Sequence, residues 1–243
     1  MSERRFEAQK KALRQRLEAD PHDRQALYDL GQLCMDDHDP TEALRWFREA
    51  LRLDPDNARI ANAMGDASFD LELYDDAVTW YRKATTLDPR FAEAWLNLAT
   101  ALMEQGRWEE AEAAVRRTIA LDAGFDEAYL YLGVCQLRQN RPLEAKQTLL
   151  EALAREPEEF QTYVALSDCC LRLGDLDGAI KACEDALEHV VEMEELDILL
   201  DSLRLAGLSP ERAEAMRRQA ENAPRRGKAE TKGRRRRTAN PRG

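Results

Sequence analysis

The amino-acid sequence predicts an all-α solenoid, and three observations lead to that fold class. First, a plan of 34 residues repeats five times between residues 24 and 193 without an insertion or a deletion. Second, Gly, Ala or Ser stands at positions 8 and 20 of every unit, where a small residue lets two helices approach closely. Third, three of the five units close with a proline at position 32. Such a proline helps to end a helix, because the residue before it is pushed out of the α region.

The unit of residues 58–91 shows the plan clearly. It contains two helical patterns joined by a short turn, and a proline closes it: Ala61, Met64 and Gly65, then Ala77, Tyr81 and Ala84, then Pro89. The same positions recur in units 24–57, 92–125, 126–159 and 160–193. The pattern resembles the tetratricopeptide repeat (TPR) family, whose motif is W-x2-L-G-x2-Y, then A-x3-F, then P. The resemblance implies a right-handed α-solenoid of helix hairpins.

The predicted array has a helical cap at each end. Residues 1–22 form a predicted N-terminal capping helix, because its end at Ala19-Asp20-Pro21 resembles the unit end at Leu53-Asp54-Pro55. This helix would be the second half of a unit without a first half, and it would cover the apolar face of the first full repeat. Residues 194–223 form a predicted degenerate helix pair that acts as the C-terminal cap, with a turn at Gly207 and Pro210.

The formal net charge of −11 combines two oppositely charged parts. Residues 224–243 hold nine Lys or Arg and one acid, a net charge of +8, whereas residues 1–223 hold 27 bases and 46 acids, a net charge of −19. The segment 224–243 lacks periodicity and is almost free of apolar residues, so it is predicted to be a disordered basic tail. Clustered arginines neutralise phosphates, which makes a polyanion-binding site at Arg234, Arg235, Arg236 and Arg237 one candidate.

Signals of an enzyme are missing from the sequence. It has no Gly-rich phosphate loop, no G-x-S-x-G, no H-E-x-x-H and no C-x-x-C, so we expect a non-enzymatic protein without a cofactor. The odd number of cysteines argues against a disulfide framework. A metal site at Cys135, Cys169 and Cys170 is not expected, because adjacent helical residues point about 100° apart. Each cysteine is instead interpreted as a small buried apolar residue.

The sequence also bears on where the protein works. The N-terminus is charged and has no apolar core of a secretory signal. The longest mostly apolar stretch, residues 94–103, is too short to span a bilayer. These features predict a cytoplasmic protein.

The TPR resemblance implies a concave groove lined by positions 2, 5, 9, 12 and 13 of each first helix. Position 12 is apolar in all five units, and carboxylates border it. A groove of that kind suits a peptide or amphipathic helix with basic flanks. The alternative is that part of this apolar stripe merely packs against the neighbouring helix. The residues expected to bind the partner are Tyr28, Met35, Asp66, Phe69, Asp70, Leu96, Met103, Glu104, Leu130 and Leu137.

The sequence therefore predicts a protein–protein interaction scaffold or adaptor, and it leaves two other hypotheses open. In one, the arginine-rich tail binds RNA, DNA or a ribosomal surface, non-specifically and in a salt-sensitive way, because residues 225–243 contain no aromatic residue for base stacking. In the other, the +8 tail occupies the −19 body and a partner must displace it. The oligomeric state is not predicted.

Overall fold

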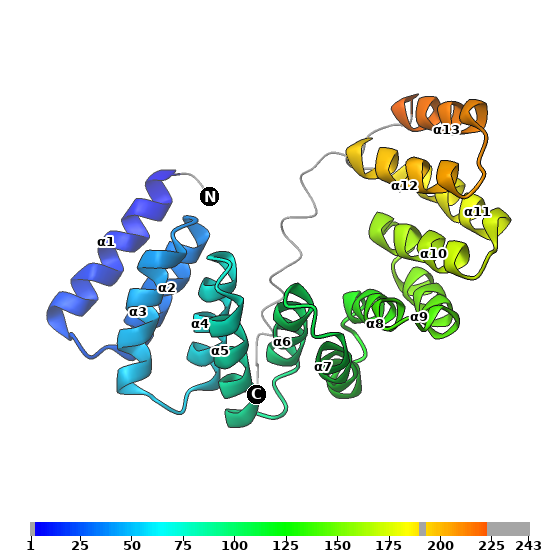
Figure 1. The fold of residues 1–243 in the computed structure, drawn as a ribbon. Coiled ribbons are helices and arrows are strands. Elements are labelled where there is room, and N and C mark those ends of the chain that lie inside the picture. Colours follow the sequence, from blue (N-terminus) through cyan, green and yellow to red (C-terminus); the bar gives the residue numbers. More distant parts are fainter. Residues whose placement is uncertain (1–2, 190–192, 223–243) are drawn as a thin grey trace. The chain divides into compact units, whose positions relative to one another are not determined.

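The protein was analysed as a computed structural model that describes residues 3–189 and 193–222. Every regular element in these two ranges is helical (Figure 1). The α-helices are α1 (Glu3–Ala19), α2 (Arg24–Asp36), α3 (Pro40–Leu53), α4 (Ala58–Asp70), α5 (Tyr74–Leu87), α6 (Ala92–Glu104), α7 (Trp108–Leu121), α8 (Glu127–Arg138), α9 (Pro142–Arg155), α10 (Phe160–Arg172), α11 (Leu176–Ala186), α12 (Met193–Leu205) and α13 (Pro210–Asn222). A short 3₁₀ helix, Leu187–His189, follows α11 directly.

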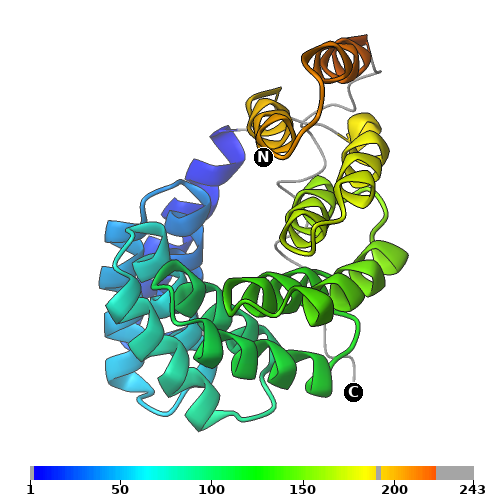
Figure 2. The same cartoon turned by 45° about the vertical axis from the view of Figure 1, so that its right-hand side comes forward.

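The chain divides into two compact units, residues 1–135 and residues 136–243. The first unit contains α1 to α7 and most of α8, and the second contains the last turn of α8 and all later helices. Within the first unit, consecutive helices pack as antiparallel hairpins, which Figures 1 and 2 both show for α2 to α7. Within the second unit, α10 packs against both α9 and α11, and α12 packs against α13.

Each hairpin turns on one residue in the left-handed region. At position 15 of the five predicted units, φ is +58° for His38, +59° for Glu72, +70° for Gly106, +60° for Asn140 and +74° for Gly174. The amide of the residue just after this position donates a hydrogen bond to a carbonyl of the first helix. An example is Leu73 N, which donates to Ser68 O at 2.9 Å. This bond satisfies a carbonyl that the helix end would otherwise leave without a partner.

The second helix of the first hairpin begins with a capping side chain and a proline. Asp39 is the N-cap, its carboxylate accepts a hydrogen bond from the Glu42 amide at 2.9 Å, and Pro40 occupies the first helical position. A capping side chain satisfies one of the free amides at the start of a helix, and proline has no amide to leave free there. Both features stabilise the start of α3.

The close approach of paired helices depends on position 8. A Cβ atom at Gly31 or Gly65 would overlap the ring of Phe47 or Tyr81, which stands at position 24 of the same hairpin. Both rings are buried, at 0% and 3% exposure. Position 8 must therefore be glycine wherever position 24 is an aromatic residue.

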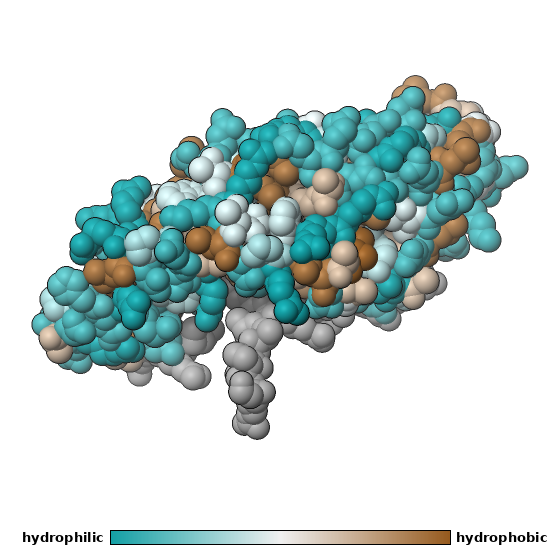
Figure 3. All heavy atoms as spheres, turned by 90° about the horizontal axis from the view of Figure 1, so that it is seen from below, coloured by the Kyte–Doolittle hydropathy of each residue, from teal (hydrophilic) through white to brown (hydrophobic). Residues whose placement is uncertain are grey.

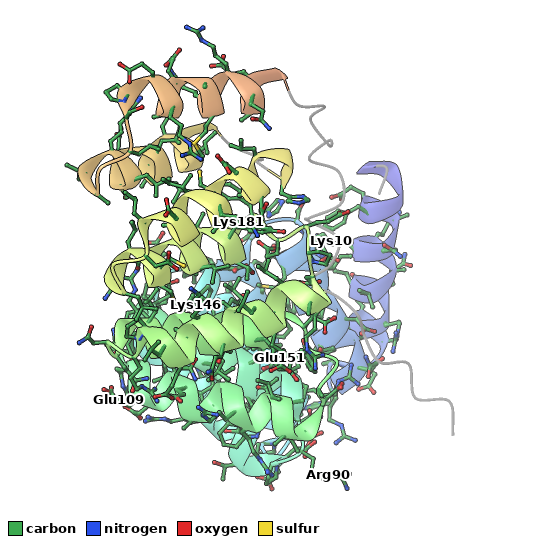
Figure 4. All side chains as sticks on the ribbon, turned by 90° about the vertical axis from the view of Figure 1, so that its right-hand side faces the viewer. Lys10, Arg90, Glu109, Lys146, Glu151 and Lys181 are labelled. Carbon is green, nitrogen blue, oxygen red and sulfur yellow. The ribbon has the colours of Figure 1, made fainter. Side chains whose placement is uncertain are left out.

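The N-terminal helix α1 packs against α2. Leu17 contacts the apolar cluster around Phe47. Lys10, labelled in Figure 4, lies 3.5 Å from Asp37 and 3.6 Å from Glu42 between its Nζ atom and their carboxylates. This helix therefore combines a small apolar contact with a half-buried ion-pair network.

The last hairpin is more regular than its weak apolar pattern indicates. α12 and α13 bury Leu196, Leu199, Leu203 and Ala213 in one cluster with residues of α11. α12 begins 33 residues after α10, one fewer than the 34-residue spacing of the first helices α2, α4 and α6. The left-handed turn residue Gly207, with φ +118°, again stands at the fifteenth position from the start of its hairpin. Because the last hairpin is displaced by one residue from the 34-residue period, a comparison at that fixed period does not detect it.

Candidate functional site

The first helices of three hairpins lie side by side in the first unit, because α4 contacts both α2 and α6. Thirteen of the fifteen residues at positions 2, 5, 9, 12 and 13 of these helices are exposed or half-buried, and we call these thirteen the groove face. They are Gln25, Tyr28, Gln32, Met35 and Asp36 on α2, Arg59, Asp66, Phe69 and Asp70 on α4, and Glu93, Thr100, Met103 and Glu104 on α6.

The apolar row at position 12 is only partly covered. Met35, Phe69 and Met103 are half-buried, and each packs against an apolar cluster of the first unit. The Phe69 ring also meets the Tyr74 ring edge-on, with 5.3 Å between their centroids. Each side chain thus contributes to the core and keeps an accessible portion. Binding of a partner by that portion stays a prediction.

Three other residues of the predicted site lie elsewhere. Leu96 and Leu137 are each only 4% exposed, so they offer a partner little surface. Leu137 also belongs to the second unit, whereas the groove face belongs to the first. Leu130 of α8 is half-buried in the first unit.

A polar network holds Asp66 in the middle of the groove face. Its carboxylate accepts hydrogen bonds from Tyr81 Oη at 2.9 Å, Asn97 Nδ2 at 3.1 Å and Asn62 Nδ2 at 3.2 Å. Burial and then the neighbouring Asp66 raise the pKa of Tyr81 well above its ordinary value, so its hydroxyl stays a donor. The network joins α4, α5 and α6 and fixes the orientation of one predicted binding carboxylate.

Tyr28 on α2 is held in a similar way by the next helix. The guanidinium of Arg59 on α4 lies 5.5 Å from the centroid of the Tyr28 ring, and Gln32 donates a hydrogen bond to the Tyr28 hydroxyl at 3.1 Å. Burial raises the pKa of Tyr28, and the positive charge of Arg59 acts against this rise. A cation on the ring face and a donor at the hydroxyl leave Tyr28 one preferred orientation.

Position 13 ends each first helix with a charged residue, and the sign changes along the chain. α2, α4 and α6 end in Asp36, Asp70 and Glu104, whereas α8 and α10 end in Arg138 and Arg172. The C-terminal end of a helix carries partial negative charge, which disfavours a carboxylate by about 0.3–1 kcal/mol and favours a cation. Asp70 and Glu104 are exposed and form no ion pair with any described residue.

A shallow pocket opens where the turn of the second hairpin meets that of the third. It has a volume of about 760 Å³ and is lined by Glu72, Leu73, Tyr74, Asp75, Asp76, Glu104, Gln105 and Arg107. We call it the turn pocket. Only Glu104 belongs to the predicted site, because the TPR resemblance directs attention to the first helices and not to the turns. The run E-L-Y-D-D at residues 72–76, acidic around two apolar residues, was the available sequence signal.

Large exposed apolar side chains are few among the described residues. In the first unit Leu73, in the turn pocket, is 47% exposed, and the others are Leu143, Leu150, Ile198 and Leu205 of the second unit. On the face drawn in Figure 3, apolar residues are dispersed among hydrophilic ones. Leu73 therefore marks the turn pocket as a place where apolar surface and carboxylates meet.

The cysteines are buried, and none is part of a disulfide. All five are free thiols, and burial raises the pKa of Cys34, Cys169 and Cys183 to about 12 in each case. Within residues 3–189 and 193–222, no group of three or more His, Cys, Asp or Glu residues is arranged to hold a metal ion.

In the same ranges, no helix is both long and apolar enough to cross a membrane. The run Arg234–Arg237 lies outside the described residues.

The repeated hairpins, the small residue at position 8 and the groove face define a TPR protein. The chain belongs to the family of the cilia and flagella-associated protein 70 C-terminal domain, a TPR domain that matches residues 2–198. Among curated proteins, no sequence matches this chain significantly.

Solved structures support the same fold. A crystal structure of MamA is 25% identical, with a TM-score of 0.64 over 68% of this chain and 91% of MamA. PilW, a widely conserved type IV pilus biogenesis factor, is 22% identical, with a TM-score of 0.71 over 82% of this chain and 92% of PilW. YrrB, a TPR protein with an unusual peptide-binding site, is 17% identical, with a TM-score of 0.69 over 79% of this chain and 98% of YrrB. The predicted all-α TPR solenoid class is confirmed.

Proposed function

We propose that the protein is a non-enzymatic interaction scaffold that binds a peptide or amphipathic helix of a partner protein on the groove face of its first unit. TPR proteins of this kind generally serve as protein-interaction scaffolds. The observation that carries the proposal is the pair of carboxylates Asp70 and Glu104. Each ends a helix at the electrically unfavourable end and has no ion pair with a described residue. Because no ion pair with a described residue offsets this unfavourable position, we infer that they serve binding.

The neighbouring apolar row supplies the other half of the recognition. Met35, Phe69 and Met103 are half-buried, so a partner that covers their remaining surface gains hydrophobic free energy without a large rearrangement. The carboxylates select basic flanks and speed association. The expected ligand is therefore one or more apolar residues bordered by Lys or Arg.

The proposal is tested with a peptide library displayed against the full chain. We expect the selected peptides to combine apolar residues with flanking Lys or Arg. The variant Asp70→Lys/Glu104→Lys should bind them at least about tenfold more weakly, which corresponds to about 1.4 kcal/mol. Its thermal midpoint should stay the same or rise, because a lysine at a helix C-terminus interacts favourably with the helix dipole.

Two further variants make the result specific. Phe69→Ala/Met103→Ala should also weaken binding, and its helical circular dichroism at the assay temperature reports whether it remains folded. Glu49→Lys reverses an exposed charge on the second helix α3 and should leave binding unchanged. Equal affinity of the wild-type chain and Asp70→Lys/Glu104→Lys would exclude the groove face as the site.

A second candidate function rests on the composition of the C-terminal segment. Nine Lys or Arg among residues 224–243 could bind a polyanion such as RNA. The test replaces Arg234, Arg235, Arg236 and Arg237 by Gln in the full chain and measures binding to an RNA oligonucleotide at several salt concentrations. This function predicts weaker binding and a shallower salt dependence in the variant, while the groove-face variants bind RNA like the wild type.

We propose the cytoplasm as the place of this function. Five free thiols, all buried, are typical of a protein kept in a reducing compartment. Fractionation of cells that produce the tagged chain, followed by detection in the cytoplasmic or the extracytoplasmic fraction, tests this location.

A further inference from the structure

The turn pocket carries more negative charge than its own cations balance. Glu72, Asp75, Asp76 and Glu104 line it, and Arg107 is its one lining cation. Arg107 is already bound to Glu110, with 2.6 Å between Nη2 and Oε1, and also donates to Gln105 at 3.0 Å. Asp75 accepts one hydrogen bond, from Gln105 at 2.7 Å. The pocket thus has the charge to receive additional cations.

The other carboxylates of the turn pocket are available to bind a cation. Glu72, Asp76 and Glu104 form no ion pair with any residue in the described part of the chain, and all three are exposed. Burial, followed by the negative charges of Glu104 and Glu72, raises the pKa of Tyr74 in the same pocket. An approaching cation therefore meets several carboxylates at once.

The wall of the pocket is apolar. Leu73 is 47% exposed, Tyr74 is half-buried, and the Phe69 ring packs edge-on against Tyr74 at 5.3 Å. Arginine fits such a surface, because its aliphatic stem and flat guanidinium cover apolar and aromatic groups while its N–H groups pair with carboxylates. The chemistry of the pocket therefore favours an arginine-rich segment.

The chain carries such a segment at its own C-terminus. Residues 224–243 have a net charge of +8 and contain four consecutive arginines. We propose that this segment, through Arg234–Arg237, occupies the turn pocket and competes with basic-flanked partners for the acidic end of the groove face. Glu104 belongs to both surfaces, so one ligand excludes the other there. The inference rests on the proposed function for its regulatory consequence, but the contact itself can be tested separately.

A tethered segment can compete even when its intrinsic affinity is low. Attachment to the same polypeptide makes this contact intramolecular, so its occupancy does not depend on protein concentration. The attraction between exposed charges weakens as salt rises, because the screening length falls to about 8 Å at physiological ionic strength. Self-occupancy of the pocket should therefore be strongest at low salt.

The direct test uses a synthetic peptide of residues 224–243. The receptor is the full chain in which Arg234–Arg237 are replaced by Gln, so that its own segment does not compete. We expect binding that depends on salt concentration. The variant Glu72→Lys/Glu104→Lys should bind the peptide at least about tenfold more weakly. The control Glu49→Lys should bind the peptide like the parent, and a peptide with Gln at the four arginine positions should not bind. Absence of binding, or equal loss in the Glu49→Lys control, would overturn the proposal.

The regulatory consequence is tested with a peptide selected for the groove face. At low salt, the full chain with Gln at residues 234–237 should bind that peptide at least about fivefold more tightly than the wild type does. A factor of this size is within the usual range of coupling free energies between two sites. Equal affinity of the two chains would overturn self-occupancy. A gain that disappears on dilution would also overturn the intramolecular form and assign the contact to a second copy.

The two proposals fail in different ways. Asp70→Lys and Glu72→Lys separate them, because Asp70 lies only on the groove face and Glu72 lies only in the turn pocket. If selected peptides bind and the 224–243 peptide does not, the groove face remains the site and the inference is wrong. If only the 224–243 peptide binds, the pocket remains and the proposed function is wrong.

Discussion

At the scale of single residues, the spacing of each helix pair depends on two side chains that must match in size. Gly31 and Gly65 leave room for the rings of Phe47 and Tyr81. In the third hairpin the same positions hold Ala99 and Val115, both fully buried. A larger residue at position 8 thus accompanies a smaller one at position 24, as close packing requires.

This complementarity gives a stability prediction for the first hairpin. Gly31→Ala should lower the free energy of unfolding by about 1–3 kcal/mol, because the new methyl group overlaps the Phe47 ring. The double variant Gly31→Ala/Phe47→Val reproduces the pair of the third hairpin and should lose less than the sum of the two single changes. Urea unfolding of the four proteins measures the coupling, and strictly additive losses would contradict the prediction.

The second residue-scale prediction concerns the hydroxyl of Tyr81. Tyr81→Phe removes the hydrogen bond to Asp66 and should cost about 1.5–3 kcal/mol, the usual contribution of a hydrogen bond to a charged group. Tyr74→Phe is the matched control, because the Tyr74 hydroxyl makes no hydrogen bond to a described residue and its ring contact remains. We expect a change below about 0.5 kcal/mol for the control. Similar losses in the two variants would argue against the Asp66 network.

At the scale of the helix hairpin, the turn is a fixed element that tolerates several sequences. The left-handed position 15 holds His, Glu, Gly, Asn and Gly in the five units. Glycine adopts this conformation without steric cost, whereas a residue with a Cβ pays about 1–2 kcal/mol. The backbone hydrogen bonds of the hairpin hold the turn even where the side chain disfavours it.

The turn of the second hairpin provides a test of this strain. Glu72→Gly should raise the free energy of unfolding by up to about 1 kcal/mol, because glycine relieves the left-handed conformation. Ala113→Gly, at an exposed position inside α7, should lower it by a similar amount, because glycine there only adds flexibility to the unfolded chain. Chemical unfolding measures both values. A loss of stability in Glu72→Gly would contradict the assigned turn geometry.

At the scale of the whole molecule, buried residues form apolar clusters within each unit. The five cysteines belong to these cores, and all five are buried. Because a thiolate is the reactive form of cysteine, a pKa near 12 keeps a thiol unreactive at neutral pH.

This arrangement predicts how the intact chain reacts with a thiol reagent. In the folded protein at pH 8, we expect none of the cysteines to react promptly, and all five to react in concentrated denaturant. The rates at Cys34, Cys169 and Cys183 in the folded protein should stay low as the pH rises through about 8.5, the ordinary value for cysteine, because burial raises the pKa of each of these thiols to about 12. Quantitative mass spectrometry of the labelled peptides identifies the residues. Prompt modification of Cys34 or Cys183 would show that the corresponding core opens.

The sequence by itself determined the class of the protein and the positions of its hairpins. Gly65, Ala77 and Pro89 recur at a fixed period, and a helix pair must place small residues where its axes approach. The last hairpin was less clear, because a shift of one residue removes α12 from the 34-residue period although Leu199 and Leu203 still point into the core.

The set of residues accessible to a partner depended more strongly on tertiary structure than the fold class did. Sequence position could name Leu96 and Phe69 as equivalent candidates, but only packing decides that Leu96 is buried while Phe69 stays half-exposed beside Tyr74. The turn pocket brings together residues 72–76 and 104–107, which lie about one repeat apart in the chain. Local periodicity specifies which face of a helix is apolar. How much of each side chain remains accessible is set by neighbours from other hairpins, and only the packed helices determine that.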